Sequence, residues 1–473
     1  MRRLFACVAL LGAWITGCDE PSPASNIPVH VVDPIAANPA LGCGPGTLEL
    51  VVDQGGGMAT FVASAAVDAS GNFDVPLEIA TYTAVTRIQM TMDLQECELV
   101  GAVPSFLLSD VPFVRVVMGR ELSCQDLDEP QLTTGRTDPA LVAFDGNLLI
   151  VGGTTRGTST DRLVPIANPV LTYENAIPPD DRNPFPVLPR PMQATRASRF
   201  SVSRVVYATV DYVARFDTNL RSGAGARMLP THDGSGGESA VVDLGAEGVA
   251  IVGGVDGRGD PVREISWIDP LDESIDITEL ATPRRNPVAT TVGGVLVIAG
   301  GQAEGEPLFE VARLRSDGVA LEGSPTEVRE GAVLVAPQRR VGVLLGGLAA
   351  DGTTVRDDTL VVTGCPDACR VSVGTPWAFP RLRPATAETV GGVWLLGGEA
   401  ADGTAQATVE IVKRVGDAVS IEELADGLPT ARARAGAALF ADGIVAIIGG
   451  VDDEGEELRS MALCWPRELD PLN

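Results

Sequence analysis

The 473-residue sequence has few of the side chains that most enzymes and nucleic-acid-binding proteins use. It contains one lysine, Lys413, two histidines, His30 and His232, and four tyrosines, and aromatic residues make up 4% of the chain. Acidic residues outnumber basic ones by 63 to 35, which gives a net charge of −28. A chain this acidic repels phosphate backbones and anionic membrane surfaces. We therefore expect no nucleic-acid partner.

The common catalytic motifs are also missing from the sequence. No Gly-x-Ser-x-Gly segment stands at a strand-to-helix turn, and the glycine-rich segment 233–237 is typical of a loop. The spacing of Cys365 and Cys369 fits neither a four-cysteine zinc site nor a Cys-x-x-Cys redox motif. We expect no catalytic residue, no metal and no cofactor. Arg258-Gly259-Asp260 spells an adhesion tripeptide, which we attribute to chance in loops rich in these residues.

Only the N-terminus carries a long apolar run. Arg2 and Arg3 precede an apolar segment from Leu4 to Ile15, which is too short for a stable membrane helix. The sequence then continues Ile15-Thr16-Gly17-Cys18, which resembles the cleavage box of bacterial lipoproteins. The resemblance implies a signal peptide at 1–17, lipid attachment at Cys18 and a cell-envelope location, on either the inner or the outer membrane. Residues 18–42, rich in proline, are expected to form a linker.

A second feature dominates the rest of the chain: an apolar run that ends in Gly-Gly occurs six times. The first glycines of successive copies are separated by 101, 47, 46, 51 and 52 residues. A period near fifty with one doubled gap is typical of a propeller, in which each repeat forms one blade. The glycine pairs are Gly152 and Gly153, Gly253 and Gly254, Gly300 and Gly301, Gly346 and Gly347, Gly397 and Gly398, and Gly449 and Gly450.

Each run is too short for a helix and has no polar alternation, so it predicts a strand that is buried on both faces. A second segment of small residues lies about ten residues upstream, and turn signals such as Gly293-Gly294 separate the two. The stacked blades of a propeller cover both faces of such strands. The sequence therefore predicts an all-β propeller over residues 131–473.

These repeats resemble the kelch family of β-propellers. Three further family features are present in part: a Pro-Arg step before the small-residue strand, an apolar-acid step after the third strand, and Trp377 at the position of a fourth-strand tryptophan. The Pro-Arg steps are Pro283-Arg284 and Pro380-Arg381, with a looser copy at Pro429 and Arg432. Copper oxidases related to this family need two histidines, tyrosines and a thioether cysteine near the axis. With so few of these residues, we expect no such copper site.

The doubled gap favours one further blade, because 101 residues is about twice the period. The segment 199–217 is rich in valine and lacks Gly-Gly, and as a degenerate repeat it gives seven blades. The competing interpretation is six blades with a long excursion at 155–235. The last repeat ends after three strands, so we expect residues 118–133 to supply a fourth strand that closes the ring.

Six cysteines remain outside the signal peptide and Cys18, and they allow fifteen pairings. We predict Cys43–Cys97 in the N-terminal region, Cys365–Cys369 as a local clip and Cys124–Cys464 across the ring closure. Disulfides are typical of an oxidising compartment.

Residues 43–130 lack the repeat and show short alternating strands, which predicts a small β-sandwich-like module. The alternative is that part of this segment packs under the propeller as an extension.

We expect a monomeric, non-enzymatic lipoprotein of the cell envelope whose propeller binds a protein or a glycan. The alternatives are an enzyme that acts on envelope polysaccharide at the channel mouth, and a purely structural surface protein. Arginines near the inner strands either bind an anionic ligand or serve as the structural arginine of the kelch family, and we favour the structural role. They are Arg284, Arg285, Arg381, Arg383, Arg432 and Arg434.

Overall fold

The computed structural model describes most of the chain from the first strand onward. The described residues are 26–32, 43–53, 61–68, 78–80, 85–107, 114–127, 132, 134–144, 147–155, 158–166, 187–192, 196–201, 204–208, 213–217, 226–228, 238–301, 305–415, 418–441, 443–467 and 469. The predicted signal peptide, Cys18, most of the predicted linker and His232 lie outside these residues. Among the described residues, no helix is long and apolar enough to cross a bilayer.

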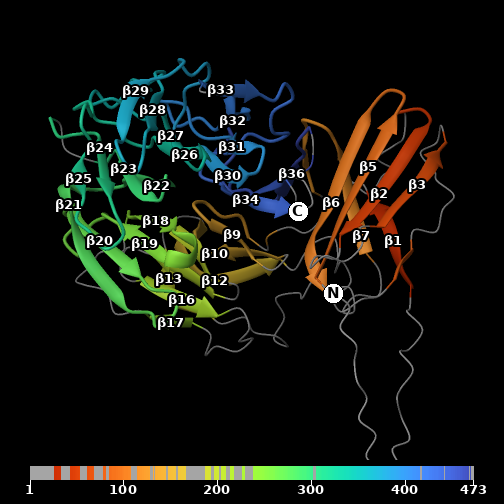
Figure 1. Cartoon of the computed structure of the whole chain (residues 1–473), viewed down its shortest axis with the longest axis horizontal. Helices are drawn as coiled ribbons and strands as arrows, with labels where there is room; N and C mark the ends of the chain where they lie inside the picture. The colour runs from red at the N-terminus through yellow and green to blue at the C-terminus, as the bar shows by residue number, and fades with distance from the viewer. Residues whose placement is uncertain are drawn as a thin grey trace, which may run out of the picture.

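The described part of residues 131–473, joined by one strand from residues 124–126, forms seven antiparallel sheets arranged as the blades of a wheel (Figure 1). Blade one comprises β9 (Ala140–Phe144), β10 (Asn147–Val151), β11 (Thr154–Thr155), β12 (Thr158–Ile166) and β13 (Val187–Met192). Blade two comprises β14 (Arg196–Ser201), β15 (Arg204–Ala208), β16 (Val213–Asp217) and β17 (Ala226–Met228), and blade three comprises β18 (Ala240–Asp243), β19 (Val249–Val252), β20 (Val262–Ile268) and β21 (Ile275–Arg284). Blade four comprises β22 (Val288–Val292), β23 (Val295–Ala299), β24 (Phe309–Ala312) and β25 (Val319–Ala320).

Blade five comprises β26 (Val333–Gln338), β27 (Val341–Leu345), β28 (Leu360–Thr363) and β29 (Arg370–Val373). Blade six comprises β30 (Ala385–Thr389), β31 (Gly392–Leu396), β32 (Val409–Val415) and β33 (Ala418–Glu423). Blade seven comprises β34 (Gly436–Ala441), β35 (Ile444–Ile448), β36 (Met461–Cys464) and β8 (Cys124–Asp126). Blade two is the segment without Gly-Gly. The described residues therefore support seven blades and not six.

The Gly-Gly runs form the second strand of every blade except blade two, and the strands that they form are buried as predicted. Every residue of β23, β27, β31 and β35 is buried. The apolar side chains of neighbouring blades meet in shared clusters, for example those of blades four and five and those of blades six and seven. Because burial of one Val, Leu or Ile side chain contributes about 1.5–3 kcal/mol, the stacking of blades is the main source of stability in the wheel.

The last blade is completed by a strand from before the first blade. Strand β8 pairs with β36, and Cys464 lies opposite Cys124, to which it is joined by a disulfide. The strand came from the segment that we expected to close the ring. The wheel is also closed near its axis, where β34 of blade seven contacts β9 of blade one.

The N-terminal module is a seven-stranded path in the order β3-β2-β5-β6-β7-β1-β4. Its strands are β1 (Asn26–Val32), β2 (Gly46–Asp53), β3 (Phe61–Val67), β4 (Glu78–Ala80), β5 (Val85–Leu94), β6 (Glu98–Leu107) and β7 (Val114–Arg120). Two features differ from our expectation. Strand β1 comes from the predicted linker and pairs in parallel with β7, and the module ends at β7 rather than at residue 130, because β8 belongs to the propeller.

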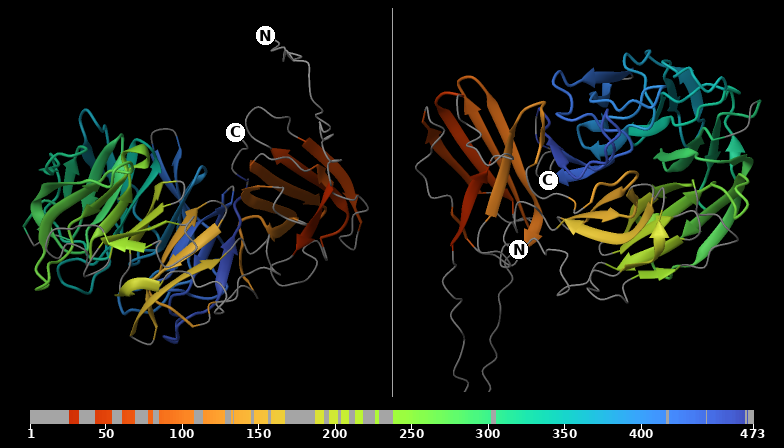
Figure 2. Two further views of the ribbon diagram at one scale, coloured as in Figure 1. Left: turned by 90° about the horizontal axis from the view of Figure 1, so that it is seen from below. Right: turned by 180° about the vertical axis from the view of Figure 1, so that it is seen from behind.

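The module packs against the propeller on the side of its last blade (Figures 1 and 2). Val100 and Ala102 of β6 share one buried cluster with residues of blades one and seven, including Leu463 and Trp465. A Cβ atom at Gly119 of β7 would lie 2.2 Å from the Trp465 ring, so the indole needs a glycine at this position. The module is thus a lateral extension of the wheel.

Candidate functional site

The wheel has two ends, and we name them by the turns that lie there. The Gly-Gly face is the end where the second strand of each blade finishes. The hairpin face is the opposite end, where the turns between the first and second strands lie, such as residues 244–248, 293–294 and 339–340. The axial strands run between the two faces, so each face collects one turn from every blade.

A ring of buried arginines lies beneath the Gly-Gly face. Five arginines that precede the inner strands are at most 2% exposed, and each donates to the carbonyl oxygen of the first glycine of its own Gly-Gly pair. They are Arg136, Arg284, Arg329, Arg381 and Arg432. A side chain that is buried inside a blade is not accessible to a ligand. The structural role that we favoured is therefore correct for Arg284, Arg381 and Arg432.

Acidic residues complete these arginine sites. Glu310 accepts hydrogen bonds from Arg284 at 2.7 Å, and Glu410 accepts one from Arg381 at 2.5 Å. In blade seven the acid is Asp126 of β8, which accepts from Arg432 at 2.6 Å. Burial lowers the pKa of Arg284, Arg381 and Arg432, and the carboxylates oppose that effect. The closing strand thus supplies the counter-charge that the last blade needs.

Trp377 belongs to the same arrangement. We expected it on the fourth strand of its blade, but it lies outside that strand. It follows β29 in the chain, is buried, and donates its indole N–H to Glu410 at 2.7 Å. The Arg381 guanidinium stacks 4.9 Å from the centre of its ring. This tryptophan therefore holds a buried ion pair in place.

A second set of residues at the Gly-Gly face is partly or fully exposed, and its backbone has a positive φ. Two residues after each buried arginine the chain adopts a positive φ, at Asp138 (51°), Asn286 (50°), Gly331 (70°), Arg383 (46°) and Arg434 (56°), and Glu238 of blade three does the same (58°). Non-glycine residues rarely adopt this conformation, and they concentrate at functional sites. Backbone bonds link the positions across blades, because Asp138 donates to Arg434 and Arg383 to Gly331.

Charged side chains form the rim of this opening. Arg434 pairs with Asp138, Arg285 pairs with Glu238, and Arg383 lies 3.7 Å from both Glu330 and Glu399. We name these seven residues the charged rim. The arginine side chains are 43–55% exposed, whereas Asp138, Glu238 and Glu399 are 12–24% exposed. Glu330, at 60%, is the most exposed residue of the charged rim. Arg285 and Arg434 therefore extend further into solvent than the carboxylates with which they pair, and Arg383 lies between the exposed Glu330 and the nearly buried Glu399.

The loops after Gly-Gly are built on aspartates that bind their own backbone. Asp256 accepts from the N–H groups of Arg258 and Asp260 at 2.8 and 3.0 Å, and Asp351 accepts from Thr353 and Thr354. The hydroxyl of Thr354 and these N–H groups lower the pKa of Asp351 to about 2. The Arg258-Gly259-Asp260 tripeptide is part of such a turn, in which the N–H of Asp260 donates to the carboxylate of Asp256.

The six cysteines form the three predicted bridges, Cys43–Cys97, Cys124–Cys464 and Cys365–Cys369. The third bridge clips the β28–β29 hairpin. None of these sulfurs is therefore available as a nucleophile or as a metal ligand.

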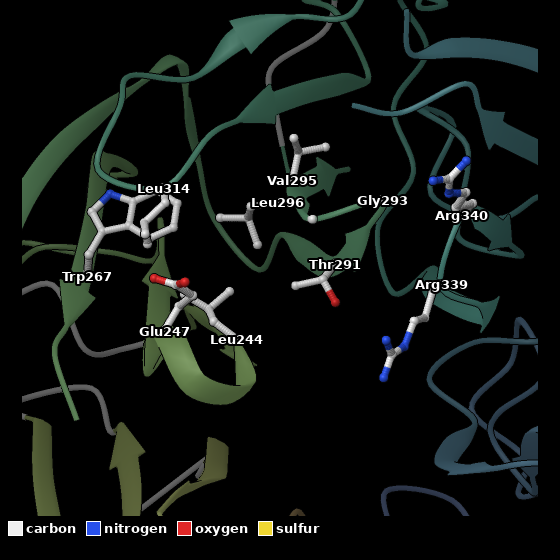
Figure 3. A pocket seen from close by; sticks show the side chains of 11 residues that line it. Leu244, Glu247, Trp267, Thr291, Gly293, Val295, Leu296, Leu314, Arg339 and Arg340 are labelled. Atoms are coloured by element: carbon white, nitrogen blue, oxygen red, sulfur yellow. The ribbon is translucent and has the colours of Figure 1, made fainter. Parts of the chain in front are cut away.

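A pocket of about 460 Å³ opens at the hairpin face, between the turns of blades three, four and five. Glu247, Thr291, Arg339 and Arg340 supply its polar groups (Figure 3). We did not predict a binding pocket at the hairpin face from the sequence. Its signal was available, because Glu247, the Gly293-Gly294 turn and Arg339 occupy equivalent turns about one repeat apart, but no motif marks them individually.

Comparison with known proteins shows similarity at the level of the fold. No family model matches the sequence, and no curated protein matches it. Among solved structures, the chain is similar to a fungal alcohol oxidase of the AA5 family in complex with copper. The identity is 16%, the match covers 72% of this chain and 76% of that chain, and the TM-score is 0.52.

This similarity, together with the six four-stranded sheets, the one five-stranded sheet and the Gly-Gly repeat, decides the fold. The protein is a kelch-type β-propeller. A second solved structure, that of YjhT, matches with 10% identity over 72% of this chain and 98% of that chain, at a TM-score of 0.42. The similarity to the alcohol oxidase, at 16% identity, is one of fold alone, so the function of this propeller has to be argued from its own residues.

The part of the propeller that the structure describes contains no set of ligands that fits a copper ion. Among the described residues, no group of three or more His, Cys, Asp and Glu side chains is arranged to hold a metal. His30 lies on β1 of the N-terminal module, and the six cysteines outside residues 1–42 are all in disulfides. We therefore derive no copper-dependent step for this propeller.

Proposed function

We propose that the protein is a lipid-anchored binding protein of the cell envelope, and that it binds a protein or glycan partner at the charged rim of its Gly-Gly face. The observation that carries the proposal is the ion-pair geometry of the rim. Arg285 and Arg434 are half-exposed and pair with less exposed carboxylates, and the half-exposed Arg383 lies between Glu330 and Glu399. Four residues of the rim, Asp138, Glu238, Arg383 and Arg434, have a positive φ. Such preorganised donors favour carboxylate or sulfate groups.

The disulfides support a location outside the cytoplasm, where such bridges persist. The sequence around Cys18 supports anchoring by acyl chains, which would hold the wheel at a membrane although its own net charge of −28 repels anionic lipid. Labelling cells with a fatty-acid analogue tests the anchor. The wild type should carry the label and sediment with membranes, and Cys18→Ser should do neither. Labelled Cys18→Ser would contradict the proposal.

Binding is tested by capture of partners from envelope extracts and on a glycan array. The protein should be the mature chain with Cys18→Ser, which keeps β1 and the complete module. We expect saturable capture that is lost in Arg383→Gln/Arg434→Gln and kept in Arg370→Gln, an exposed arginine on β29. Capture should weaken with salt, because exposed charges are screened. Equal capture by the rim variant would overturn the assignment of the rim.

A further inference from the structure

The pocket on the hairpin face is built by three consecutive blades. Its walls come from the short helix η3 (Gly245–Glu247) between β18 and β19, from the Gly293-Gly294 turn, and from the turn at Arg339. The N–H of Gly293 donates to the carbonyl of Arg339 at 2.5 Å, so the last two turns are joined. A Cβ atom at Gly293 would lie 2.4 Å from the carbonyl oxygen of Cys365. The floor of the pocket is therefore fixed, and its volume of about 460 Å³ falls within the range of small-molecule sites.

The polar groups of the pocket are separated by charge. Figure 3 shows the Glu247 carboxylate, the Thr291 hydroxyl and the Arg339 guanidinium following one another across the opening, with Arg340 beyond. Elsewhere in the propeller, exposed arginines such as Arg285, Arg315 and Arg434 are ion-paired. Among the described residues, the side chains of Glu247, Arg339 and Arg340 form no salt bridge. The pocket thus offers a negative end and a positive end that do not neutralise each other.

An apolar wall lies beside these groups. Trp267 and Leu314 lie side by side in Figure 3, with Leu296 next to them. The indole N–H of Trp267 is already used, because it donates to Thr278 at 2.8 Å, and the Leu314 side chain is 40% exposed. Trp267 and Leu296 are only 3% and 2% exposed, so they support Leu314 from behind and Leu314 offers the accessible apolar surface. A Leu side chain placed on Leu314 would leave water at a favourable free energy.

From this arrangement we propose that the pocket binds a short free peptide with apolar side chains. The N-terminal ammonium pairs with Glu247, the C-terminal carboxylate pairs with Arg339, and Thr291 bonds to an amide between them. Arg340 adds positive charge beyond Arg339, and an apolar side chain packs on Leu314. The proposal goes beyond the binding function proposed above, because this pocket lies at the other end of the wheel from the charged rim.

A purely anionic ligand fits this end of the wheel less well. Asp243 and Glu388 lie on inner strands β18 and β30, at or next to the ends that reach the hairpin face, so they add negative charge near the pocket. A purely cationic ligand meets the two arginines instead. A zwitterion satisfies both ends, which is the reason to choose a peptide with two free termini.

Calorimetric titration of the Cys18→Ser chain with tri-leucine tests the proposal. Two matched probes remove one charge each: N-acetyl-tri-leucine lacks the ammonium, and tri-leucine amide lacks the carboxylate. We expect saturable binding of tri-leucine, and about tenfold weaker binding of each blocked peptide, because each loses one charge-assisted contact. Glu247→Gln should weaken tri-leucine but leave the affinity of the acetylated peptide unchanged. Arg339→Gln/Arg340→Gln should weaken tri-leucine but not the amide.

Arg258→Gln, an exposed arginine of the opposite face, is the control and should bind tri-leucine like the wild type. Each variant should keep the unfolding temperature of the wild type, which separates lost binding from lost folding. The proposal is overturned if tri-leucine shows no saturable binding at millimolar concentration, or if blocking either terminus leaves its affinity unchanged. Partner capture at the charged rim does not depend on either result, so the two proposals can fail separately.

Discussion

At the scale of single residues, the same amino acid has two roles in this propeller. Arg381 is buried against Glu410, whereas Arg383, two residues later, is half-exposed at the rim. The sequence alone could not separate these roles, because both arginines precede an inner strand. The difference arises from the backbone, which turns to positive φ at Arg383 and directs the two side chains into different surroundings.

The buried pair gives a prediction about stability. Glu410→Gln leaves the charge of Arg381 buried without its counter-charge, which typically costs about 3–5 kcal/mol. Asp358→Asn, at the 28% exposed acid of the Arg329 site, is the matched comparison and should cost less, because solvent reaches that pair. Urea unfolding followed by far-UV circular dichroism measures both. Equal losses in the free energy of unfolding would show that burial does not increase the cost of removing the counter-charge of Arg381.

Glu388 gives a prediction about pH. Desolvation, and secondarily the charge of Asp243, raises the pKa of Glu388 above its usual value of 4.5. Its ionisation therefore opposes folding, and this cost appears as pH rises above the unfolded pKa and levels off above the folded pKa. Glu388→Gln should unfold at a higher temperature than the wild type near neutral pH and at the same temperature below pH 4.5. A difference that is independent of pH would contradict the assignment.

At the scale of elements, the blades were predictable because two physical demands coincide. A short run of Val, Ile and Leu has to be covered on both faces, and the glycines that follow have to adopt positive φ, so each blade leaves a strong pattern. Two strands escaped prediction. β6 contains Gly101 and Pro104, and Gly101 is required by Met118, whose sulfur would lie 2.4 Å from an added Cβ atom. β1 contains Pro28 and is defined by its pairing with β7.

The repeat glycines can be tested against a matched control. Gly397 has a φ of 58°, and an added Cβ atom would lie 2.2 Å from the carbonyl oxygen of Arg432 in the next blade. Gly352 has a similar φ of 67° but open space around it. Gly352→Ala should cost about 1 kcal/mol from backbone strain alone. Gly397→Ala should lower the urea midpoint more than Gly352→Ala does. Equal midpoints in the two variants would show that the space between Gly397 and Arg432 can accommodate a methyl group.

At the scale of the whole molecule, the N-terminal module, the first blade and the last blade form one buried cluster. The sequence indicated the closing strand, because the last repeat was one strand short. It did not indicate the lateral packing of β6 on blades one and seven, because that contact depends on surface shape and a single glycine against Trp465 rather than on a repeating pattern. Both candidate binding sites likewise depend on turns from several blades, which only the closed wheel brings together.

The closing disulfide should contribute strongly to stability. Cys124 and Cys464 are 340 residues apart, so opening their bridge restores the entropy of a very long loop, worth about 5–6 kcal/mol in the chain-entropy model. Cys124→Ser/Cys464→Ser should therefore unfold at a much lower urea concentration than the wild type. The control Cys365→Ser/Cys369→Ser opens a bridge across only four residues and should lose less. A larger decrease in urea midpoint for Cys365→Ser/Cys369→Ser than for Cys124→Ser/Cys464→Ser would contradict the role of β8 in closing the ring.

Strand β8 also constrains the order of events when the protein is made. Cys124 of this strand is synthesised 340 residues before Cys464, and Asp126 is synthesised 306 residues before Arg432. During that interval the growing chain holds an unpaired strand edge and a free thiol, both of which invite wrong partners. Maturation of this wheel therefore ends with a single late event, in which its earliest propeller strand meets its latest one.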